Sequence, residues 1–178
     1  EAVMKLKGQD IVKKFIPIVD INITAFIPDN WIGDKEQKIV EYKRLAAVES
    51  QRELDIIVDE WKDRFGNIPE EVVNLITVTR IRLLASEIGF NLIREEKDFV
   101  RIFTNYDFKL WKQLTAKMPV HIVNRTKWIK MPDSSVDGIS SILIKYSGFT
   151  PKHLLNFIEE LCLKLFKSIQ KNRGDNKE

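Results

Sequence analysis

The sequence has little of the chemistry on which most enzymes and metalloproteins depend. Its one cysteine, Cys162, excludes an internal disulfide, and its two histidines, His121 and His153, have no partner at zinc-ligand spacing. None of the seven glycines begins a phosphate-binding loop, so the Asp-Glu that ends the segment Ile56 to Glu60 does not indicate a nucleotide site. We therefore expect no catalytic residue, cofactor or metal ion, and an unrecognised hydrolase is the remaining enzymatic alternative.

Excess charge and long apolar runs are also missing. The 29 basic and 26 acidic residues leave a net charge of only +3, which is low for a dedicated nucleic-acid-binding protein. No signal peptide and no membrane-spanning run is recognisable, so we expect a cytoplasmic protein. With 178 residues and 44% hydrophobic content, the chain can bury a core as a monomer. Because it begins at Glu1 without a methionine, we expect a fragment of a longer protein.

The most complete local signals lie between Ser50 and Gly89. Ser50 and Glu53 form a capping-box pattern, and Gly66 suits the end of the helix that follows. Pro69 suits the first position of a second helix, which Gly89 ends. The apolar stripe of the first helix comprises Leu54, Ile57, Val58, Trp61 and Phe65. This pattern predicts two amphipathic helices separated by a tight break.

The periodicity on either side predicts an α+β fold with a helical N-terminal half of three amphipathic helices, a small mostly antiparallel sheet and a long C-terminal helix. The predicted strands are 18–27, 92–93, 99–103, 120–123, 127–131 and 142–146. The further helices are 34–49, with the apolar residues Ile39, Tyr42, Leu45, Ala46 and Val48, then 107–118, and a helix opened by Thr150 and Pro151. We expect a disordered polar tail over 171–178.

One face of the predicted helix over 50–65 is a candidate protein-binding surface. At 100° per residue, the side chains opposite the apolar stripe are Arg52, Ile56, Asp59, Glu60 and Asp63. An exposed isoleucine within a rim of carboxylates is typical of a protein interface. The alternative is a solvated face with one stray isoleucine.

A second candidate surface is the basic stretch from Phe99 to Pro132, which has seven bases and one acid. The candidate nucleic-acid contacts are Arg101, Lys109, Lys112, Arg125 and Lys127, and the nearby aromatic residues are Tyr106, Trp111 and Trp128. Ordinary solvation of surface lysines is the alternative that we favour. We therefore expect this stretch to contribute little affinity for DNA.

Several short motifs resemble the C-terminal domain of bacterial transcription-repair coupling factors. They are Tyr42-Lys43-Arg44-Leu45-Ala46, Asp63-Arg64-Phe65-Gly66 and Pro69-Glu70-Glu71, with Ile27-Pro28-Asp29 upstream. The resemblance covers 19–89, and beyond Gly89 only the hydrophobic pattern agrees. It implies that 1–17 are the end of a motor region and a linker, including a helix that closes at Gly8, and that 18–170 form the domain.

The resemblance also implies a function. In this family the C-terminal domain is not the motor of the DNA-translocating ATPase that couples stalled transcription to excision repair. It folds back on an N-terminal module that recruits the repair protein UvrA, and masks it. Acidic residues of that contact align with Glu60 and Asp63, so we expect an intramolecular interface at Ile56, Asp59, Glu60 and Asp63. UvrA and RNA polymerase would then be partners through the parent protein.

Overall fold

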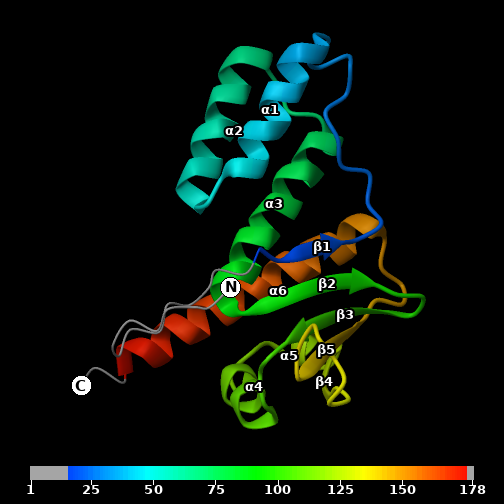
Figure 1. Cartoon of the computed structure of the whole chain (residues 1–178), viewed down its shortest axis with the longest axis vertical. Helices are drawn as coiled ribbons and strands as arrows, with labels where there is room; N and C mark the ends of the chain where they lie inside the picture. The colour runs from blue at the N-terminus through cyan, green and yellow to red at the C-terminus, as the bar shows by residue number, and fades with distance from the viewer. Residues whose placement is uncertain (1–15, 176–178) are drawn as a thin grey trace.

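The computed structural model describes residues 16–175, and these form two groups of elements that share one helix (Figure 1). The helices are α1 (Lys35–Ala47), α2 (Gln51–Phe65), α3 (Glu70–Ile88), α4 (Phe108–Thr115), α5 (Val120–Val123) and α6 (Pro151–Asp175). The strands are β1 (Ile18–Asp20), β2 (Phe90–Glu95), β3 (Phe99–Thr104), β4 (Thr126–Lys130) and β5 (Ser140–Lys145). The predicted α+β class is confirmed.

Local caps set the ends of α2 much as predicted. The Ser50 hydroxyl accepts a hydrogen bond from the Glu53 backbone N–H at 3.1 Å. The Glu53 carboxylate accepts from the backbone N–H of Glu49 at 2.9 Å, one residue before the cap that the capping box predicts. Gly66 ends the helix with a φ of 81°, a conformation that a side chain would strain. Pro69 is the cap residue of α3, one position before the predicted one.

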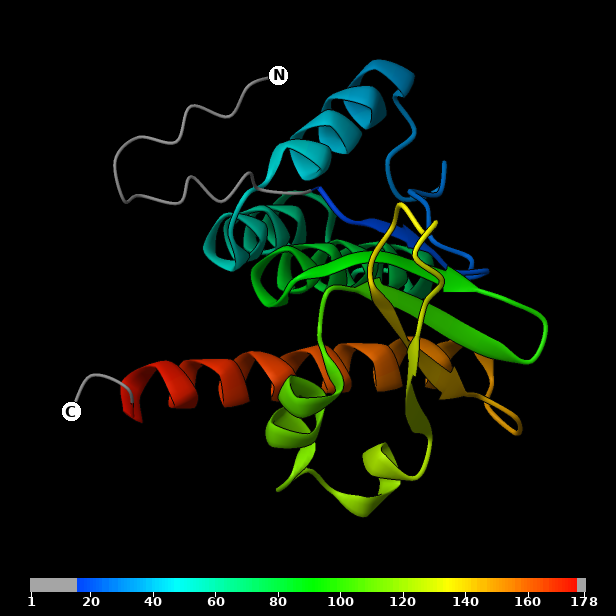
Figure 2. The same ribbon diagram turned by 60° about the horizontal axis from the view of Figure 1, so that its bottom comes forward.

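The sheet has the strand order β1-β2-β3-β5-β4, with β1 parallel to β2 and the other pairs antiparallel. Its inner face packs against α6 and the C-terminal half of α3, and Figure 2 shows α6 running along the sheet. Val100, Ile102 and Ile142 are fully buried on this face. Because side chains alternate along a strand, Arg101 and Leu143 lie on the opposite face, away from the helices.

A second, smaller core joins α1 and α2 to the N-terminal half of α3. Its buried members include Leu45, Leu54, Trp61 and Val72. Trp31, from the loop before α1, packs edge-on against Trp61 with ring centroids 5.7 Å apart. The predicted stripe of α2 is therefore confirmed as the buried face, and this fixes which side of the helix is exposed.

One predicted strand is shorter than expected and another is wrong. Only Ile18–Asp20 of the stretch 18–27 pairs with the sheet, although inward and outward side chains still alternate as far as Ile27. The run Val120–Val123 is the short helix α5 rather than a strand. Pro119 precedes it, and the Pro119 carbonyl accepts from the N–H groups of Ile122 and Val123, so local geometry overrides the strand preference of valine and isoleucine.

Other differences concern a helix end and one helix face. Helix α6 continues to Asp175, so a disordered tail beginning at Lys171 is wrong for 171–175; Arg173 in the last turn suits the negative end of the helix. Ile39 is 54% exposed rather than part of the core of α1. The predicted helix end at Gly8 and most of the linker over 9–17 lie outside the described residues.

Candidate docking face on the first two helices

The exposed side of α2 presents an isoleucine beside carboxylates, as its periodicity predicts. Burial of Leu54 and Trp61 turns the opposite side of the helix to solvent. Ile56 is 58% exposed, and Asp59 and Asp63 are also exposed. These three side chains share one helical face because they are three and four residues apart.

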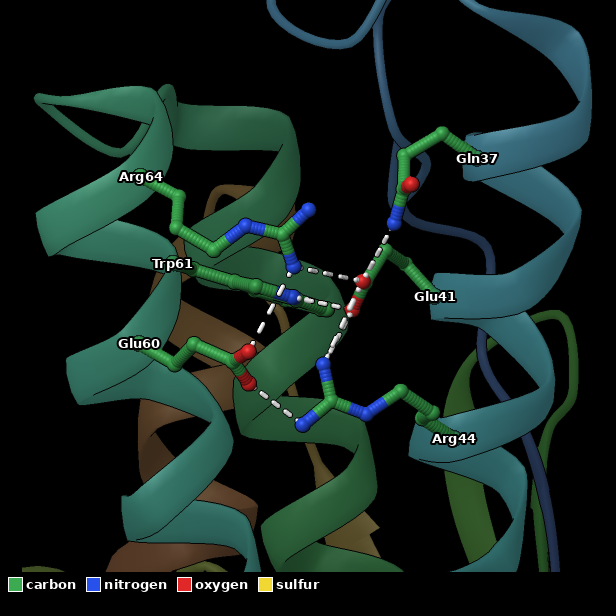
Figure 3. A network of polar contacts seen from close by, with 6 residues as sticks. All are labelled: Gln37, Glu41, Arg44, Glu60, Trp61 and Arg64. Carbon is green, nitrogen blue, oxygen red and sulfur yellow. Dashed lines mark hydrogen bonds and ion pairs between the residues drawn. The ribbon is translucent and has the colours of Figure 1, made fainter.

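A buried carboxylate joins α2 to α1, and the sequence did not reveal it. Glu41 of α1 is fully buried and points at α2 (Figure 3). It accepts hydrogen bonds from the Trp61 indole N–H at 2.6 Å and from the Gln37 amide at 2.8 Å. Arg44 Nη1 lies 3.0 Å from one carboxylate oxygen of Glu41, and Arg64 Nη1 lies 3.4 Å from the other. The buried charge is thus surrounded by donors, which is the condition for its burial.

Glu60 belongs to the same network and differs from the other predicted interface residues. Its carboxylate pairs with Arg44 of α1 and with Arg64 one turn further along α2 (Figure 3). The hydrogen bond from Arg44 is the main reason that the pKa of Glu60 lies below its ordinary value. Glu60 is therefore a partly exposed carboxylate that two arginines already pair. Of the four predicted interface residues, Ile56, Asp59 and Asp63 remain freely exposed.

Beside Ile56 the surface is hollowed between the end of α1 and α2. The hollow measures about 340 Å³, and its lining residues are Arg44, Ala47, Val48, Glu53, Ile56 and Ile57. On α1, Val40 is 48% exposed and adds apolar surface to that helix. The adjacent Ile39 is 54% exposed as well. The candidate docking face therefore extends from α2 onto α1.

The basic stretch does not form the predicted stacking groove. Trp111 and Tyr106 are buried in the core, and the Trp128 indole N–H donates to the Tyr106 carbonyl at 2.9 Å. The Arg101 guanidinium lies 3.0 Å from Glu96 and donates to Ser141 at 2.9 Å. The aromatic surfaces and this arginine are already engaged.

The remaining candidate bases lie on separate elements. Arg125 donates to the carbonyls of Lys145 and Ser147 and lies 4.1 Å from the Phe149 ring centroid. Lys109 and Lys112 are on α4, whereas Lys127 is on β4. Arg101 and Lys127 both neighbour Leu143 on the outer face of the sheet, so the structure brings these two candidate contacts to one face, whereas Lys109 and Lys112 lie on α4.

The histidines and the cysteine are not assembled into a metal site within residues 16–175. This part of the chain has no group of three or more His, Cys, Asp or Glu side chains placed to hold a metal ion. Cys162 is fully buried, and that burial raises the pKa of its thiol far above the ordinary value. His121 lies 2.8 Å from Glu160 on the surface. Within the same range, no helix is both long and apolar enough to cross a bilayer.

Together these features define an α+β domain in which a helix pair and a sheet are joined through one long helix, α3. The chain belongs to the TRCF domain family: the family model matches residues 21–112, just over half of the 178 residues. The match extends past Gly89, further than the motifs, and the resemblance to transcription-repair coupling factors is confirmed.

Relatives and solved structures agree with this assignment. The transcription-repair-coupling factor of Bacillus subtilis (strain 168) is 38% identical over 103 residues, which are 57% of this chain and 9% of that protein. The Rickettsia typhi protein of the same name is 34% identical over 111 residues, or 60% of this chain and 10% of that protein. The chain thus spans about a tenth of their length.

A crystal structure of the C-terminal domain of a transcription-repair coupling factor has the same fold. It aligns with a TM-score of 0.67 at 14% identity and covers 89% of this chain and 96% of that one. The likeness therefore includes much of the region beyond residue 112, where the family match ends.

Proposed function

We propose that this chain is a non-catalytic, autoinhibitory docking domain of a transcription-repair coupling factor. The observation that carries the proposal is the exposed Ile56, which shares one face of α2 with Asp59 and Asp63 and lies beside a hollow of about 340 Å³. An apolar centre with a charged rim suits a protein partner. The partner would be the N-terminal UvrA-binding module of the same longer protein, and the contact would mask that module.

The network around Glu41 would serve this contact indirectly. It would hold α1 and α2 in one arrangement and so fix the position of Ile56 relative to the part of the hollow that α1 lines. A surface that is already ordered loses less entropy on binding than a flexible one. Glu60 would act within this network, as a bridge between Arg44 and Arg64, rather than as a direct contact.

The wider setting is part of the same proposal. The parent would be an ATP-dependent DNA translocase in the cytoplasm that couples transcription to nucleotide excision repair. It would contact UvrA and RNA polymerase through other regions, whereas this domain would be monomeric and would not hydrolyse ATP.

The test replaces exposed residues and leaves the network intact. We expect Ile56→Glu with Asp63→Arg to weaken binding of the N-terminal module in trans by about 2 kcal/mol or more, roughly thirtyfold in Kd, because both changes oppose a desolvated contact. Asp133→Arg, which reverses an exposed acid in the loop 132–138, is the control and should bind normally. Glu60→Arg is unsuitable because it would place a third arginine beside Arg44 and Arg64.

Two measurements decide the outcome. A thermal melt of the isolated double variant should stay close to wild type, since both side chains are exposed. A pull-down with the full-length double variant should capture more UvrA as the mask opens. An unchanged melting temperature together with wild-type UvrA capture would mean that this face does not mask the N-terminal module.

A further inference from the structure

The outer face of the sheet has a hollow near the β2–β3 turn, far in sequence from the docking face. It measures about 450 Å³, which falls within the size range of ligand sites. Phe99 on β3 pairs in register with Lys145 on β5, and Leu143 pairs with Lys127 on β4. Three adjacent strands therefore direct these four side chains to the same face, away from α6.

The rim of this hollow is positively charged. Lys97, Lys127 and Lys145 line it, and none of them forms an ion pair within residues 16–175. Asp98 is the one acid among the lining residues. Lys127 and Lys145 are diagonal neighbours across two strands, so their backbones are about 7–8 Å apart. The lysines surround a small area and leave a net positive charge there.

The floor of the hollow is apolar and aromatic. Phe99 and Leu143 contribute to it, and Tyr146 lies at its edge. The Tyr146 hydroxyl lies 2.6 Å from the carbonyl of Glu96 and 2.7 Å from that of Lys97, which ties the turn to the end of β5. A rigid aromatic floor within a ring of cations fits an anion that carries a flat apolar group.

The aromatic floor, together with its lysines, favours a nucleic-acid ligand over an acidic peptide. The fork of arginine binds carboxylate and phosphate alike through two parallel hydrogen bonds, whereas lysine binds phosphate as a compact point charge. The nearby arginines, Arg94 and Arg101, are already paired with Glu96. The unpaired cations among the lining residues are all lysines. The floor includes the Phe99 ring, against which a base can stack beside the Arg101 guanidinium, which lies 5.3 Å from the ring centroid.

We propose that this hollow binds a short segment of single-stranded nucleic acid, with one base against Phe99 and its phosphates near Lys97, Lys127 and Lys145. Duplex DNA would bind more weakly, because its stacked bases cannot reach the floor. The site shares only Lys127 with the contacts predicted from the basic stretch. With about three phosphate contacts the affinity is low, in agreement with the low net charge.

The experiment follows the fluorescence anisotropy of a short labelled oligothymidylate titrated with the chain. About three phosphate contacts predict that Kd rises roughly fifteen- to twentyfold between about 50 and about 200 mM salt. Lys127→Glu should weaken binding about tenfold. Lys130→Glu is the matched control: it lies on the same strand, is also exposed, and points to the opposite face, so its Kd should change less than about twofold.

A second pair of variants tests the aromatic floor. Phe99→Leu should weaken binding severalfold while leaving the salt dependence unchanged. Phe99→Tyr, which keeps an aromatic ring, should bind with an affinity close to wild type. Equal weakening by Lys127→Glu and Lys130→Glu would overturn the proposal in favour of diffuse attraction. Displacement of the oligonucleotide by an equal concentration of an acidic peptide would assign the hollow to a protein partner instead. The docking-face variants Ile56→Glu and Asp63→Arg should leave this binding intact, so the two proposals fail separately.

Discussion

The two cores of the molecule are held by different kinds of contact. Helix α6 contributes apolar side chains such as Leu155 and Ile158 to the sheet core, and both are fully buried. The core between α1 and α2 instead includes the buried carboxylate of Glu41 beside Trp61. Apolar contact has no direction, whereas a buried carboxylate needs particular donors. The helix pair that presents the candidate docking face is therefore held by directional contacts in addition to its apolar core.

This difference also bears on function. A substitution that repacks the sheet core should leave the outer hollow in place, because strand register, and not the volume of the core side chains, positions the residues that line it. On the helix pair, loss of one acceptor would disturb the position of both helices, since Glu41 contacts Arg44 on its own helix and Arg64 on the other. We expect the docking face to be more sensitive to single polar substitutions.

The largest expected effect comes from the apolar core. Ile158→Ala should lower the free energy of unfolding by about 2–5 kcal/mol, because it leaves a cavity between α6 and the sheet. Leu163→Ala on the same helix is the control, since Leu163 is 37% exposed, and it should change stability by about 0.5 kcal/mol or less. Urea unfolding measures both. Equal effects would contradict the assignment of the sheet side of α6 as the main core.

A smaller loss is expected from the polar network. Glu41→Leu removes the acceptor of the buried Trp61 indole N–H and should cost about 1–3 kcal/mol. Glu41→Gln keeps an acceptor oxygen for Trp61 and should cost less. Hydrogen exchange would locate the change. In Glu41→Leu the Trp61 indole proton should exchange faster than in wild type, whereas the backbone amides of β3 should keep rates close to wild type. An equal increase in the exchange rates of the Trp61 indole proton and the β3 amides would show that the two cores do not respond separately.

The smallest effect concerns pH. The pKa of Glu60 is lowered in the folded state, chiefly by the hydrogen bond from Arg44, so its contribution is present above the ordinary carboxyl pKa and is lost as pH falls through the lowered value. Because Glu60 is 37% exposed, solvent screening limits this contribution to about 1 kcal/mol or less. Melting temperatures of wild type and Glu60→Gln should therefore converge under acid conditions. A gap that widened with acidification would contradict this sign.

Local features of this protein could be read from its sequence. The caps at Ser50 and Asp107 and the stop at Gly89 depend on contacts within one helical turn, so neighbouring residues suffice to predict them. The buried stripe of α2 and the exposure of Ile56 follow from helical period alone. Val120–Val123 shows the limit, because strand preference there yields to the turn that follows Pro119.

The contacts on which the two proposals rest depend on tertiary structure. Glu41 meets Trp61 across 20 residues of sequence, and Glu60 meets Arg44 across 16, so periodicity could place these side chains on a face but could not pair them. The hollow on the sheet likewise requires β3, β5 and β4 to lie in that order, with Lys127 opposite Leu143. A helical face is determined within a few residues of chain, whereas a charge pair or a strand neighbour is determined only when distant segments pack together.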